Sequence, residues 1–557
     1  MNDSSSAIKS ALHAERLIAL RAAMAAAGVD GYLIPHADEH QHEYLPPYAE
    51  RLAWLTGFTG SSGMAVVLRN RAAFFTDGRY TLQAATQVDG ELYVHKHLVD
   101  EPPTAWLADN ASGMTVAYDP RLFTPAQVSR FEDATRRAHT TFKPLGENLI
   151  DRIWTDQPAR PAAPVEIYPE EYAGRCSAEK RKVVAKWLEK EGFDAFLVSA
   201  TDSVCWLFNI RGSDVEFSPL VIAYGLVKSD GSAALFVDPA KLSDDLARHL
   251  GKGVDIVPYD ALPDALAKLK GKISTVAYDR DTGSRWLADN IAAAGLDAKP
   301  APDPITPIKA AKGHVELDGV RAAHVRDGAA LTKFLAWFAR EAPKGNLNEI
   351  TAAEKLEDFR RFDNLYRGGS FPTICGAGGN GAIVHYRAQP ESAAKIAPNM
   401  LVLIDSGGQY LDATTDVTRT VAVGSPTPEQ RRRFTLVLKG HIALGSARFI
   451  KGTTGSQLDA LARHALWQEG LDYDHGTGHG VGTYLGVHEG PQRISKVGNT
   501  VALEPGMLIS NEPGYYKTGE YGIRIENLVV VKPADQVPGA EKPLYEFETV
   551  TLAPIDV

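Results

Sequence analysis

Residues 400–423, MLVLIDSGGQYLDATTDVTRTVAV, place two apolar runs on either side of a glycine turn. MLVLID has the length and composition of a buried strand, SGGQ supplies the turn, and YLDATTDVTRTVAV has the composition of a returning strand. The pattern predicts a β-hairpin. Asp405 lies where the first strand meets the turn and Asp416 lies on the return, so both carboxylates can face one pocket.

Two further apolar strands each contain a single carboxylate. Glu512 ends the run MLISNEPG (507–514), and Glu526 interrupts the run IRIENLVVV (523–531). Burying an unpaired carboxylate is costly, so such groups are normally paired or bound to a metal. Four carboxylates are therefore candidates for one site.

Taken one at a time, these carboxylates also have ordinary interpretations. Asp405 could cap the turn and Asp416 could pair with Arg419. Glu526 could pair with Arg524. Taken together, four carboxylates in one site would repel each other. Each pair would cost about 4 kcal/mol at a separation of about 4 Å and an effective dielectric constant of about 20. Summed over all pairs, that exceeds a typical net stability of roughly 5–15 kcal/mol. Two divalent cations would cancel the four charges, so we predict a dinuclear metal site.

The segment HGTGHGVGTYLGVHEGP (475–491) contains three histidines and six glycines. It is either a flexible surface loop or a place where glycine lets the backbone pass close to something that a histidine holds. An imidazole from this segment could complete the metal shell. His475 and His479 have the spacing of a helical His-x-x-x-His pair, but the alternating glycines disfavour a helix, so we expect His475 to have a supporting or structural role.

The composition bounds the class of protein. The chain has 557 residues, 44% of them hydrophobic and 23% charged, which is ordinary for a globular protein and too long for one core. Its net charge is −10 and it has no basic run, which argues against nucleic-acid and membrane-surface partners. Three cysteines far apart predict reduced thiols. The N-terminus lacks a signal-peptide core, and no apolar run approaches the roughly 20 residues that span a bilayer. We expect a cytoplasmic, soluble protein.

Two proline-rich stretches, QPARPAAP (157–164) and KPAPDPITPIK (299–309), predict linkers, because proline removes a backbone donor and favours extended structure. They predict three domains, over residues 1–157, 164–305 and 310–557.

The first two predicted domains have the pattern of one repeated unit. In each, a charged helix ends near a glycine, and three segments follow: an apolar run after Gly-x-Asp, a Trp-Leu segment and another apolar run. This order predicts two small α/β domains. Any two such domains share part of the pattern, but the matched Gly-x-Asp and Trp-Leu positions favour a duplication.

The third predicted domain begins with a long helix over residues 315–340. Thr427 is followed by proline, glutamate and glutamine, the pattern of a capped helix start, and predicts a helix to about Ile450. Another helix is predicted over residues 456–469, and strands lie between and after the helices. The whole chain is therefore expected to be α/β or α+β.

Four ordered blocks of this third domain resemble the aminopeptidase P family of Xaa-Pro aminopeptidases, within the pita-bread metallopeptidases. The blocks are SFPTI with GAIVHY (370–386), LIDSGGQYLDATTDVTRT (403–420), HGTGHGVG (475–482), and ISNEPGYY with GIRIEN (509–527). With the N-terminal repeat, the resemblance covers essentially the whole chain and is to the three-domain form. It implies two tandem creatinase-N-like α/β domains followed by a pita-bread catalytic domain.

The resemblance implies five metal ligands. Asp405 would chelate one metal, Asp416 and Glu526 would bridge both, and His479 and Glu512 would complete the other. An oxygen-rich shell with one histidine suits an ion harder than zinc, and Mn²⁺ is the usual choice of the family. His385 and His488 match the two histidines with which the family handles substrate.

The activity implied by the resemblance is release of the N-terminal residue from peptides with proline in the second position, by attack of a metal-bridging hydroxide. Glu512 would accept or shuttle the proton, His488 would help stabilise the oxyanion, and His385 would help hold the substrate. The resemblance would also imply a homodimer through the catalytic domain. The relatives continue past the strand matching FETVTLAPI with a helical segment, whereas this sequence ends at Val557, so the dimer stays open here.

Three alternatives remain at this point. A prolidase acting on Xaa-Pro dipeptides shares the ligand set, but prolidases generally carry one N-terminal domain. A creatinase-like amidinohydrolase is more remote. A non-catalytic pita-bread module would bind a partner protein, but such modules typically lose ligands, and all five are present here.

Overall fold

The computed structural model describes residues 2–535 and 537–556, with side chains from residue 10 onward in the first helix. It divides into two compact units. The first comprises the chain up to Ile167 with Ser177–Glu216 and Val221–Pro304, and the second comprises Tyr168–Cys176, Phe217–Leu220 and the chain from Ile305 onward.

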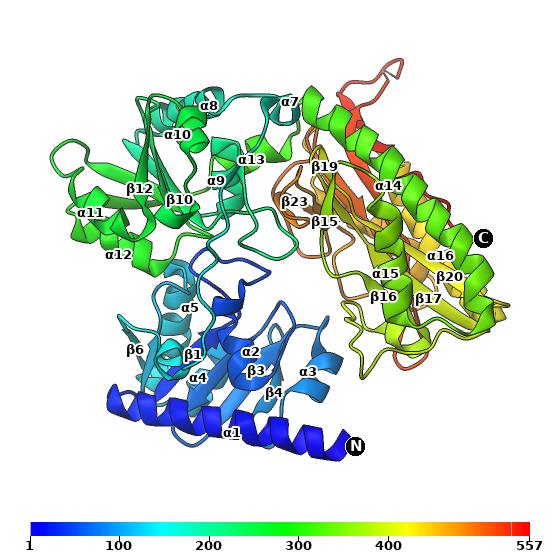
Figure 1. The fold of residues 1–557 in the computed structure, drawn as a ribbon, viewed down its shortest axis with the longest axis horizontal. Coiled ribbons are helices and arrows are strands. Elements are labelled where there is room, and N and C mark those ends of the chain that lie inside the picture. The colour runs from blue at the N-terminus through cyan, green and yellow to red at the C-terminus, as the bar shows by residue number, and fades with distance from the viewer. Residues whose placement is uncertain (1, 536, 557) are drawn as a thin grey trace. The chain divides into compact units, whose positions relative to one another are not determined.

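The first unit contains two six-stranded sheets of the same topology (Figure 1). One has the order β4-β3-β2-β1-β5-β6 and the other the order β12-β11-β10-β8-β13-β14. In both, the three central antiparallel strands have parallel strands added at the two ends. The predicted repeat is thus confirmed strand by strand.

Four of the strands, β1, β3, β8 and β11, correspond to the predicted apolar runs. The first sheet is formed by β1 (Gly31–Pro35), β2 (Met64–Leu68), β3 (Ala72–Thr76), β4 (Val94–His97), β5 (Thr115–Tyr118) and β6 (Thr141–Pro144), with α1 (Asn2–Ala26), α2 (Arg51–Thr56), α3 (Thr81–Gln87), α4 (Pro103–Asn110), α5 (Pro125–Thr135) and α6 (Leu149–Ile153). The second is formed by β8 (Ala195–Val198), β10 (Ala223–Lys228), β11 (Ala233–Val237), β12 (Val254–Pro258), β13 (Thr275–Asp279) and β14 (Asp297–Ala301), with α8 (Ser177–Glu191), α9 (Thr201–Phe208), α10 (Asp244–Leu250), α11 (Leu262–Ala267) and α12 (Arg285–Ala293). A short pair, β7 (Glu166–Ile167) and β9 (Ile210–Arg211), lies beside them.

The two sheets share one unit because the first half contributes to the core of the second. Leu45, Tyr48 and Ala49 are buried among the apolar side chains of the second sheet. His40 is buried at the same place, with its ring nitrogens 2.7 Å from the Ser199 carbonyl oxygen and 2.9 Å from the Tyr259 hydroxyl. The predicted boundary over residues 157–164 lies within this unit, between α6 of the first sheet's half and the start of β7.

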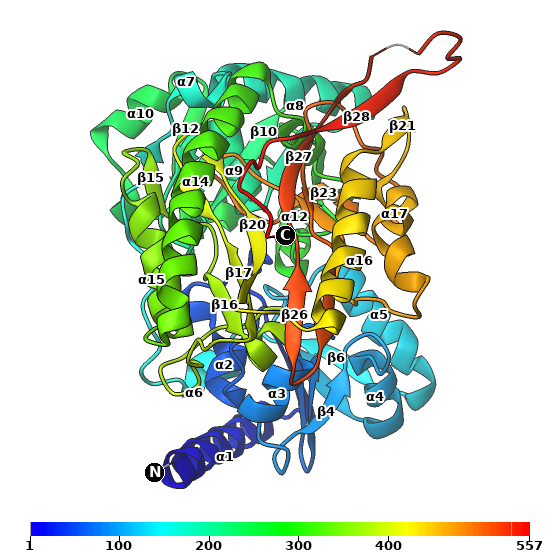
Figure 2. The ribbon, with the colours of Figure 1, turned by 90° about the vertical axis from the view of Figure 1, so that its right-hand side faces the viewer.

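The second unit has antiparallel strands between two pairs of helices (Figure 2). The helices are α14 (His314–Glu341) with α15 (Glu349–Arg360), and α16 (Pro428–Gly445) with α17 (Gly455–Trp467), together with the short α7 (Glu170–Ala173) and α13 (Ile305–Ala310). One sheet is β16 (Ile374–Ala377), β17 (Met400–Ser406) and β20 (Val417–Val423), beside the smaller β15 (Tyr366–Gly369), β18 (Gly408–Tyr410) and β19 (Ala413–Thr414). The other is β21 (Arg448–Ile450), β28 (Leu544–Thr549), β27 (Asn527–Pro533), β24 (Leu508–Asn511), β22 (Gly478–Gly480) and β23 (Glu489–Ile494), with the hairpin β25 (Gly514–Lys517) and β26 (Tyr521–Arg524).

Each helix pair buries one apolar face against its own sheet. Phe334, Phe338 and Leu356 of the first pair pack on Val402 and Ile404 of β17. Leu444, Leu458 and Ala462 of the second pair pack on Ile509 and Val529 of the larger sheet. Burial of this kind contributes roughly 1.5–3 kcal/mol for each large apolar side chain.

Several local predictions need correction. The stretch over residues 299–309 contains the end of β14 and most of α13 rather than an extended linker, because proline is tolerated on an edge strand and in the first turn of a helix. The Trp-Leu segments are the short helices α2 and α9. α16 begins with the predicted capping box at Thr427 but ends at Gly445, because Arg448–Ile450 pairs with β28 as a strand.

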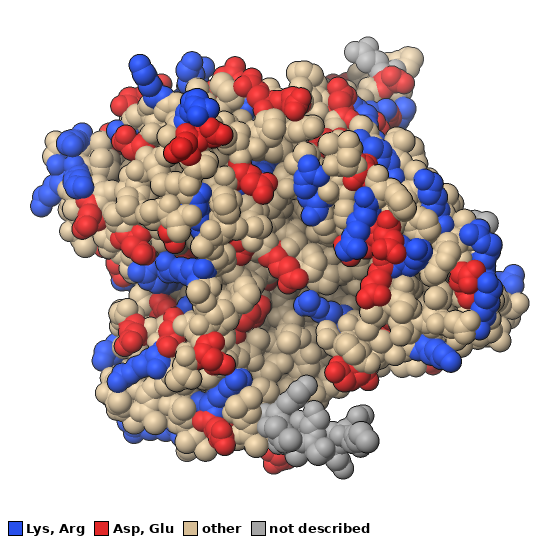
Figure 3. Space-filling model, viewed as in Figure 1, with Lys and Arg blue, Asp and Glu red and all other residues tan. Residues whose placement is uncertain are grey.

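Within the described part of the chain, the helices lack the combination of length and hydropathy that a bilayer crossing requires. On the face drawn in Figure 3, lysine and arginine side chains are interspersed with aspartate and glutamate.

Candidate metal centre

The five predicted ligands come from five separate segments of the second unit. Asp405 lies in β17, Asp416 directly precedes β20, His479 is the middle residue of β22, Glu512 directly follows β24, and Glu526 directly precedes β27. β17 and β20 pair with Asp405 opposite Thr418, so the predicted hairpin is confirmed. The ends of these strands therefore bring together the residues that the sequence separates.

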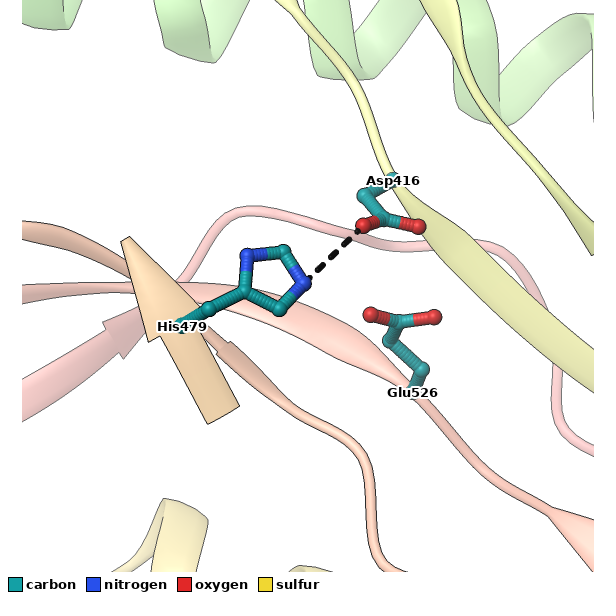
Figure 4. Close-up of side chains that lie close together, drawn as sticks. All are labelled: Asp416, His479 and Glu526. Carbon is teal, nitrogen blue, oxygen red and sulfur yellow. Dashed lines mark ion pairs between the residues drawn. The ribbon is translucent and has the colours of Figure 1, made fainter. Parts of the chain in front are cut away.

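Three of the five form a compact group (Figure 4). A side-chain ligand atom of each of Asp416, His479 and Glu526 lies within 4.8 Å of the other two. His479 Nε2 lies 3.5 Å from Asp416 Oδ2 and 3.4 Å from Glu512 Oε1. Donors that share one ion through bonds of about 2.1 Å lie roughly 3 Å apart, so this group can hold a metal with little movement.

Asp405 reaches the group from β17 with its two oxygens in different environments. Oδ2 accepts a hydrogen bond of 2.6 Å from Arg524 Nη2. Oδ1 is buried and has no hydrogen-bond partner in the described structure. The Asp405 carboxylate also interacts electrostatically with Asp416 and Glu512. A buried carboxylate oxygen without a hydrogen-bond partner fits a bound cation, because its burial is otherwise an uncompensated desolvation cost.

The pKa values in the centre indicate a deficit of positive charge. Burial, together with the carboxylates of Asp416 and Glu512, raises the pKa of Asp405 to about 6, although the Arg524 guanidinium opposes the shift. Burial is also the main cause that raises the pKa of Glu512, and it raises the pKa of Glu526 well above its ordinary value. Burial lowers the pKa of His479, but Asp416 and Glu512 outweigh it and raise the value to about 9. Groups that attract protons in this way are the groups that a cation would stabilise.

His479 is oriented as a metal-binding imidazole. Its Nδ1 lies 2.9 Å from the carbonyl oxygen of Gly480, which suits a proton on Nδ1. Nε2 then presents its lone pair to the carboxylates, the arrangement in which a neutral imidazole binds a metal. The backbone N–H of His479 donates to Ser510 Oγ, and that hydroxyl donates to Glu512 Oε1 at 3.1 Å. One serine therefore holds two of the predicted ligands.

Glycine is required beside His479 by the packing of the strands. A Cβ on Gly478 would lie 2.0 Å from the Ser510 carbonyl oxygen, and one on Gly480 would lie 2.4 Å from the Glu489 carbonyl oxygen. The prediction that these glycines allow a close approach is therefore confirmed.

The two predicted substrate histidines lie on different segments. The rings of His488 and His479 meet edge to face with centroids 4.4 Å apart. His385 follows Val384, whose carbonyl oxygen accepts from Arg524 Nη2 at 3.4 Å, which links its segment to Asp405. The residue after His488, Glu489, is buried between the ammonium groups of Lys309 and Lys312. This buried cluster holds the backbone next to His488.

Sequence reasoning missed a chain of polar contacts beside the centre. His475 Nε2 lies 2.8 Å from the Tyr516 hydroxyl, which accepts from Arg524 Nη1 at 2.7 Å. His475 is thus a supporting residue, and Arg524 pairs with Asp405 rather than with Glu526. Arg419 does not pair with Asp416 either, because its guanidinium donates to carbonyl oxygens, including that of Glu526 at 2.6 Å. The sequence signal for these contacts was Arg524, a charged residue at the end of an otherwise uncharged strand.

Comparison with known proteins gives three family matches. Residues 318–533 match metallopeptidase family M24, and residues 16–153 and 156–316 each match a creatinase/prolidase N-terminal domain. A probable Xaa-Pro aminopeptidase P of Neurospora crassa is 43% identical over 560 residues, which are 97% of this chain and 81% of that protein. The probable Xaa-Pro aminopeptidase P of Pyrenophora teres is 41% identical over 556 residues, with 97% and 85% covered.

Solved structures match the chain over different shares of its length. An X-prolyl aminopeptidase from Caenorhabditis elegans, described as a cytosolic enzyme with a di-nuclear active site, matches with a TM-score of 0.92 and 34% identity over 98% of this chain and 91% of that chain. The prolidase from Pyrococcus furiosus matches with a TM-score of 0.53 and 26% identity, over 66% of this chain and 99% of its own. The whole prolidase therefore corresponds to two thirds of the chain.

Proposed function

The chain belongs to the Xaa-Pro aminopeptidase P family of M24 metallopeptidases, and we propose that its activity resides in the centre formed by Asp405, Asp416, His479, Glu512 and Glu526. The activity of the family is release of the N-terminal residue from peptides with proline in the second position. The chain is a metallopeptidase, and its family supports two divalent ions in the site.

One observation carries the assignment of the centre. Asp416, His479 and Glu526 present ligand atoms within 4.8 Å of one another. Asp405, whose carboxylate interacts electrostatically with Asp416 and Glu512, has a buried Oδ1 without a hydrogen-bond partner among the described residues. Asp405 would hold one ion, Asp416 and Glu526 would bridge the two, and His479 and Glu512 would complete the second. Four carboxylates and one imidazole form a hard, oxygen-rich donor set, which favours Mn²⁺ over Zn²⁺.

The two ions would supply an acidified water as nucleophile at neutral pH and would polarise the scissile carbonyl. Glu512 would hold and transfer the proton, and burial raises the pKa of its carboxyl above the ordinary value. His488, at the edge of the His479 ring, would donate to the developing oxyanion, and His385 would help hold the substrate around the scissile bond.

The prolidase alternative is disfavoured by the additional N-terminal domain. Prolidases align with only about two thirds of the chain, whereas the aminopeptidase from Caenorhabditis elegans aligns with 98% of it. We further propose three domains over residues 1–157, 164–305 and 310–557, a cytoplasmic location by analogy with that cytosolic relative, and a homodimer through the catalytic domain.

The decisive experiment compares two substrates. The metal-free protein is incubated with Mn²⁺ and either the tripeptide Arg-Pro-Pro or an Xaa-Pro dipeptide, and metal bound at saturation is measured in parallel. We expect release of arginine from the tripeptide and two ions per chain. Hydrolysis of the dipeptide alone would establish the prolidase, and binding of metal without any hydrolysis would overturn the assignment to a peptidase.

A further inference from the structure

α17 contains an arginine whose side chain is completely buried behind the glycine-rich loop. Arg463 donates from Nη1 to the Tyr473 carbonyl oxygen at 2.6 Å and from Nη2 to the His475 carbonyl oxygen at 2.8 Å. Its guanidinium also stacks on the Tyr473 ring, 3.8 Å from the centroid. One rigid planar group therefore fixes two carbonyls of the segment that leads to His479.

Asp459, one turn earlier on the same helix, continues this set of contacts. Its Oδ2 accepts from Arg463 Nε at 2.6 Å, and its Oδ1 accepts from the Thr477 hydroxyl at 2.5 Å. The Thr477 hydroxyl also lies 2.6 Å from the Tyr473 hydroxyl. All of these groups are buried, so each hydrogen bond forms in a low-dielectric environment where losing it is costly.

Thr477 connects this network to two predicted metal ligands. Its carbonyl oxygen accepts the backbone N–H of Glu512 at 2.8 Å. Two residues further along the chain lies His479, and the residue between them is Gly478. Thr477 therefore connects Asp459 to Glu512 by hydrogen bonds. It connects Asp459 to His479 through the peptide Thr477-Gly478-His479.

His479 lies on β22, and the pairing of this strand with β23 and β24 fixes the backbone from Gly478 to Gly480. Glycine is obligatory at position 478, because any side chain there would collide with the Ser510 backbone. Glycine also has the largest conformational freedom to lose on folding. Thr477 directly precedes β22, so its contact with Asp459 of α17 fixes the chain at the point where the strand begins.

We propose that Asp459, Arg463 and Thr477 are positioning residues that hold His479 and Glu512 at the distances required for metal binding. This inference rests on the proposed function of the centre and assigns no contact with metal or substrate to the three residues. Outer-shell partners of this kind typically contribute a factor of about 10–100 in metal affinity or activity.

The test compares two substitutions at one position. Thr477→Val keeps the shape of the side chain but removes the hydroxyl, whereas Thr477→Ser keeps the hydroxyl. For each full-length protein, Mn²⁺ affinity is measured by calorimetry, the visible spectrum of the Co²⁺ form is recorded, and kcat and KM for Arg-Pro-Pro are determined. We expect Thr477→Val to weaken Mn²⁺ binding and lower kcat by about 10-fold or more with little change in KM, and to alter the Co²⁺ bands. Thr477→Ser should keep the Mn²⁺ affinity, kcat and Co²⁺ bands close to those of the unaltered protein.

Thr453→Val is the matched control, because the Thr453 hydroxyl is buried in the same unit but donates only locally, to the Ile450 carbonyl oxygen at 2.7 Å. It should lower the melting temperature and leave metal affinity unchanged. If Thr477→Val does not fold, Asp459→Asn replaces it, because an amide cannot accept from both Arg463 and Thr477. Melting at a lower temperature with unaltered Mn²⁺ affinity, Co²⁺ spectrum and kcat would show a structural role alone and overturn the inference. Failure of the unaltered protein to bind metal or cleave peptide would instead overturn the proposed function.

Discussion

The two carboxylate oxygens of Asp405 have different surroundings: one binds an arginine and the other is buried. Arg524 holds Oδ2 at 2.6 Å, while Oδ1 has no partner among the described residues. Arg524 opposes the rise that burial causes in the pKa of Asp405 and holds the side chain through this ion pair. The free oxygen is then available to a metal without a rearrangement of the side chain.

The bridging role proposed for Asp416 can be tested with an isosteric amide. Asp416→Asn removes one negative charge and halves the capacity of the side chain to bridge two cations. We expect the purified variant to retain less metal than the unaltered protein, to lose activity by more than the roughly 10–100-fold typical when a partner of a ligand is removed, and to melt earlier. Elemental analysis and calorimetry measure these quantities. Full metal content in the variant would refute the bridging role.

The role proposed for His488 predicts that its substitution lowers activity without loss of metal. His488→Ala leaves all five proposed ligands in place, so the ion content should stay unchanged. kcat for Arg-Pro-Pro should fall by about 10²–10³, because loss of one oxyanion donor typically has that effect. Elemental analysis beside steady-state kinetics is the measurement. Loss of metal from this variant would mean that His488 supports the centre itself.

Much of the centre could be predicted because its residues are chemically out of place locally. Asp405, Glu512 and Glu526 interrupt or end apolar strands, and His479 stands between glycines. The partners of Arg524 could not be predicted, because Asp405 and Tyr516 come to it through sheet pairing and side-chain direction rather than sequence spacing. The Arg463 network was missed for the same reason, since an i,i+4 pair with Asp459 has the appearance of an ordinary helix-surface pair.

At the scale of the elements, α16 holds the ends of two strands through one histidine. β24 and β27 pair with Asn511 opposite Asn527, which places Glu512 and Glu526 just beyond the pairing. His441 Nδ1 donates to the Asn511 carbonyl oxygen at 3.1 Å, and its Nε2 lies 3.1 Å from Asn527 Nδ2. A neutral ring with its proton on Nδ1 satisfies both contacts.

This contact predicts a pH dependence of stability. Burial, with a smaller contribution from Arg419, lowers the pKa of His441 to about 4, from 6.5. The unfolded chain therefore binds a proton that the folded chain does not, so stability falls as the pH drops below about 6.5 and the loss levels off near pH 4. At pH 5 the protonation of His441 in the unfolded chain lowers the free energy of unfolding by roughly 1–2 kcal/mol.

His441→Gln should therefore reduce the difference in free energy of unfolding between pH 7.5 and pH 5, measured by urea denaturation. Other buried histidines, such as His36 and His324, have lowered pKa values and will leave part of the difference. His464→Gln, on the exposed face of α17, is the control and should keep the full difference. An equal pH response in both variants would contradict the assignment.

The predicted boundaries of helices and strands were wrong where tertiary contacts outweighed the local amino-acid composition. The proline-rich residues 299–309 continue a sheet and start a helix, because strand β13 supplies the pairing for β14 and Pro307 needs no hydrogen-bond donor in the first turn of α13. The returning strand of the hairpin is interrupted by the small β18–β19 pair, so Asp416 lies before β20 rather than within it. Such insertions leave no periodic signal in a short stretch.

At the scale of the whole molecule, the ligands of the centre all lie in one of the two compact units. A metal that binds the folded state and not the unfolded state stabilises by about 2.7 kcal/mol when its free concentration is about 100 times the dissociation constant. That stabilisation acts on the unit that contains the ligands. The unit with the two six-stranded sheets contributes none of the five and has its own apolar cores.

Metal removal should therefore loosen one unit selectively. Hydrogen exchange, followed by mass spectrometry with Mn²⁺ and after chelation, should lose protection in the peptides that contain β20, β22, β24 and β27. The strands of the first unit should exchange at the same rates in both states, because no ligand ties them to the ions. Readdition of Mn²⁺ should restore the original rates and distinguishes metal loss from damage by the chelator. Equal loss of protection across both units, or none in the four strands named, would contradict a centre confined to the second unit.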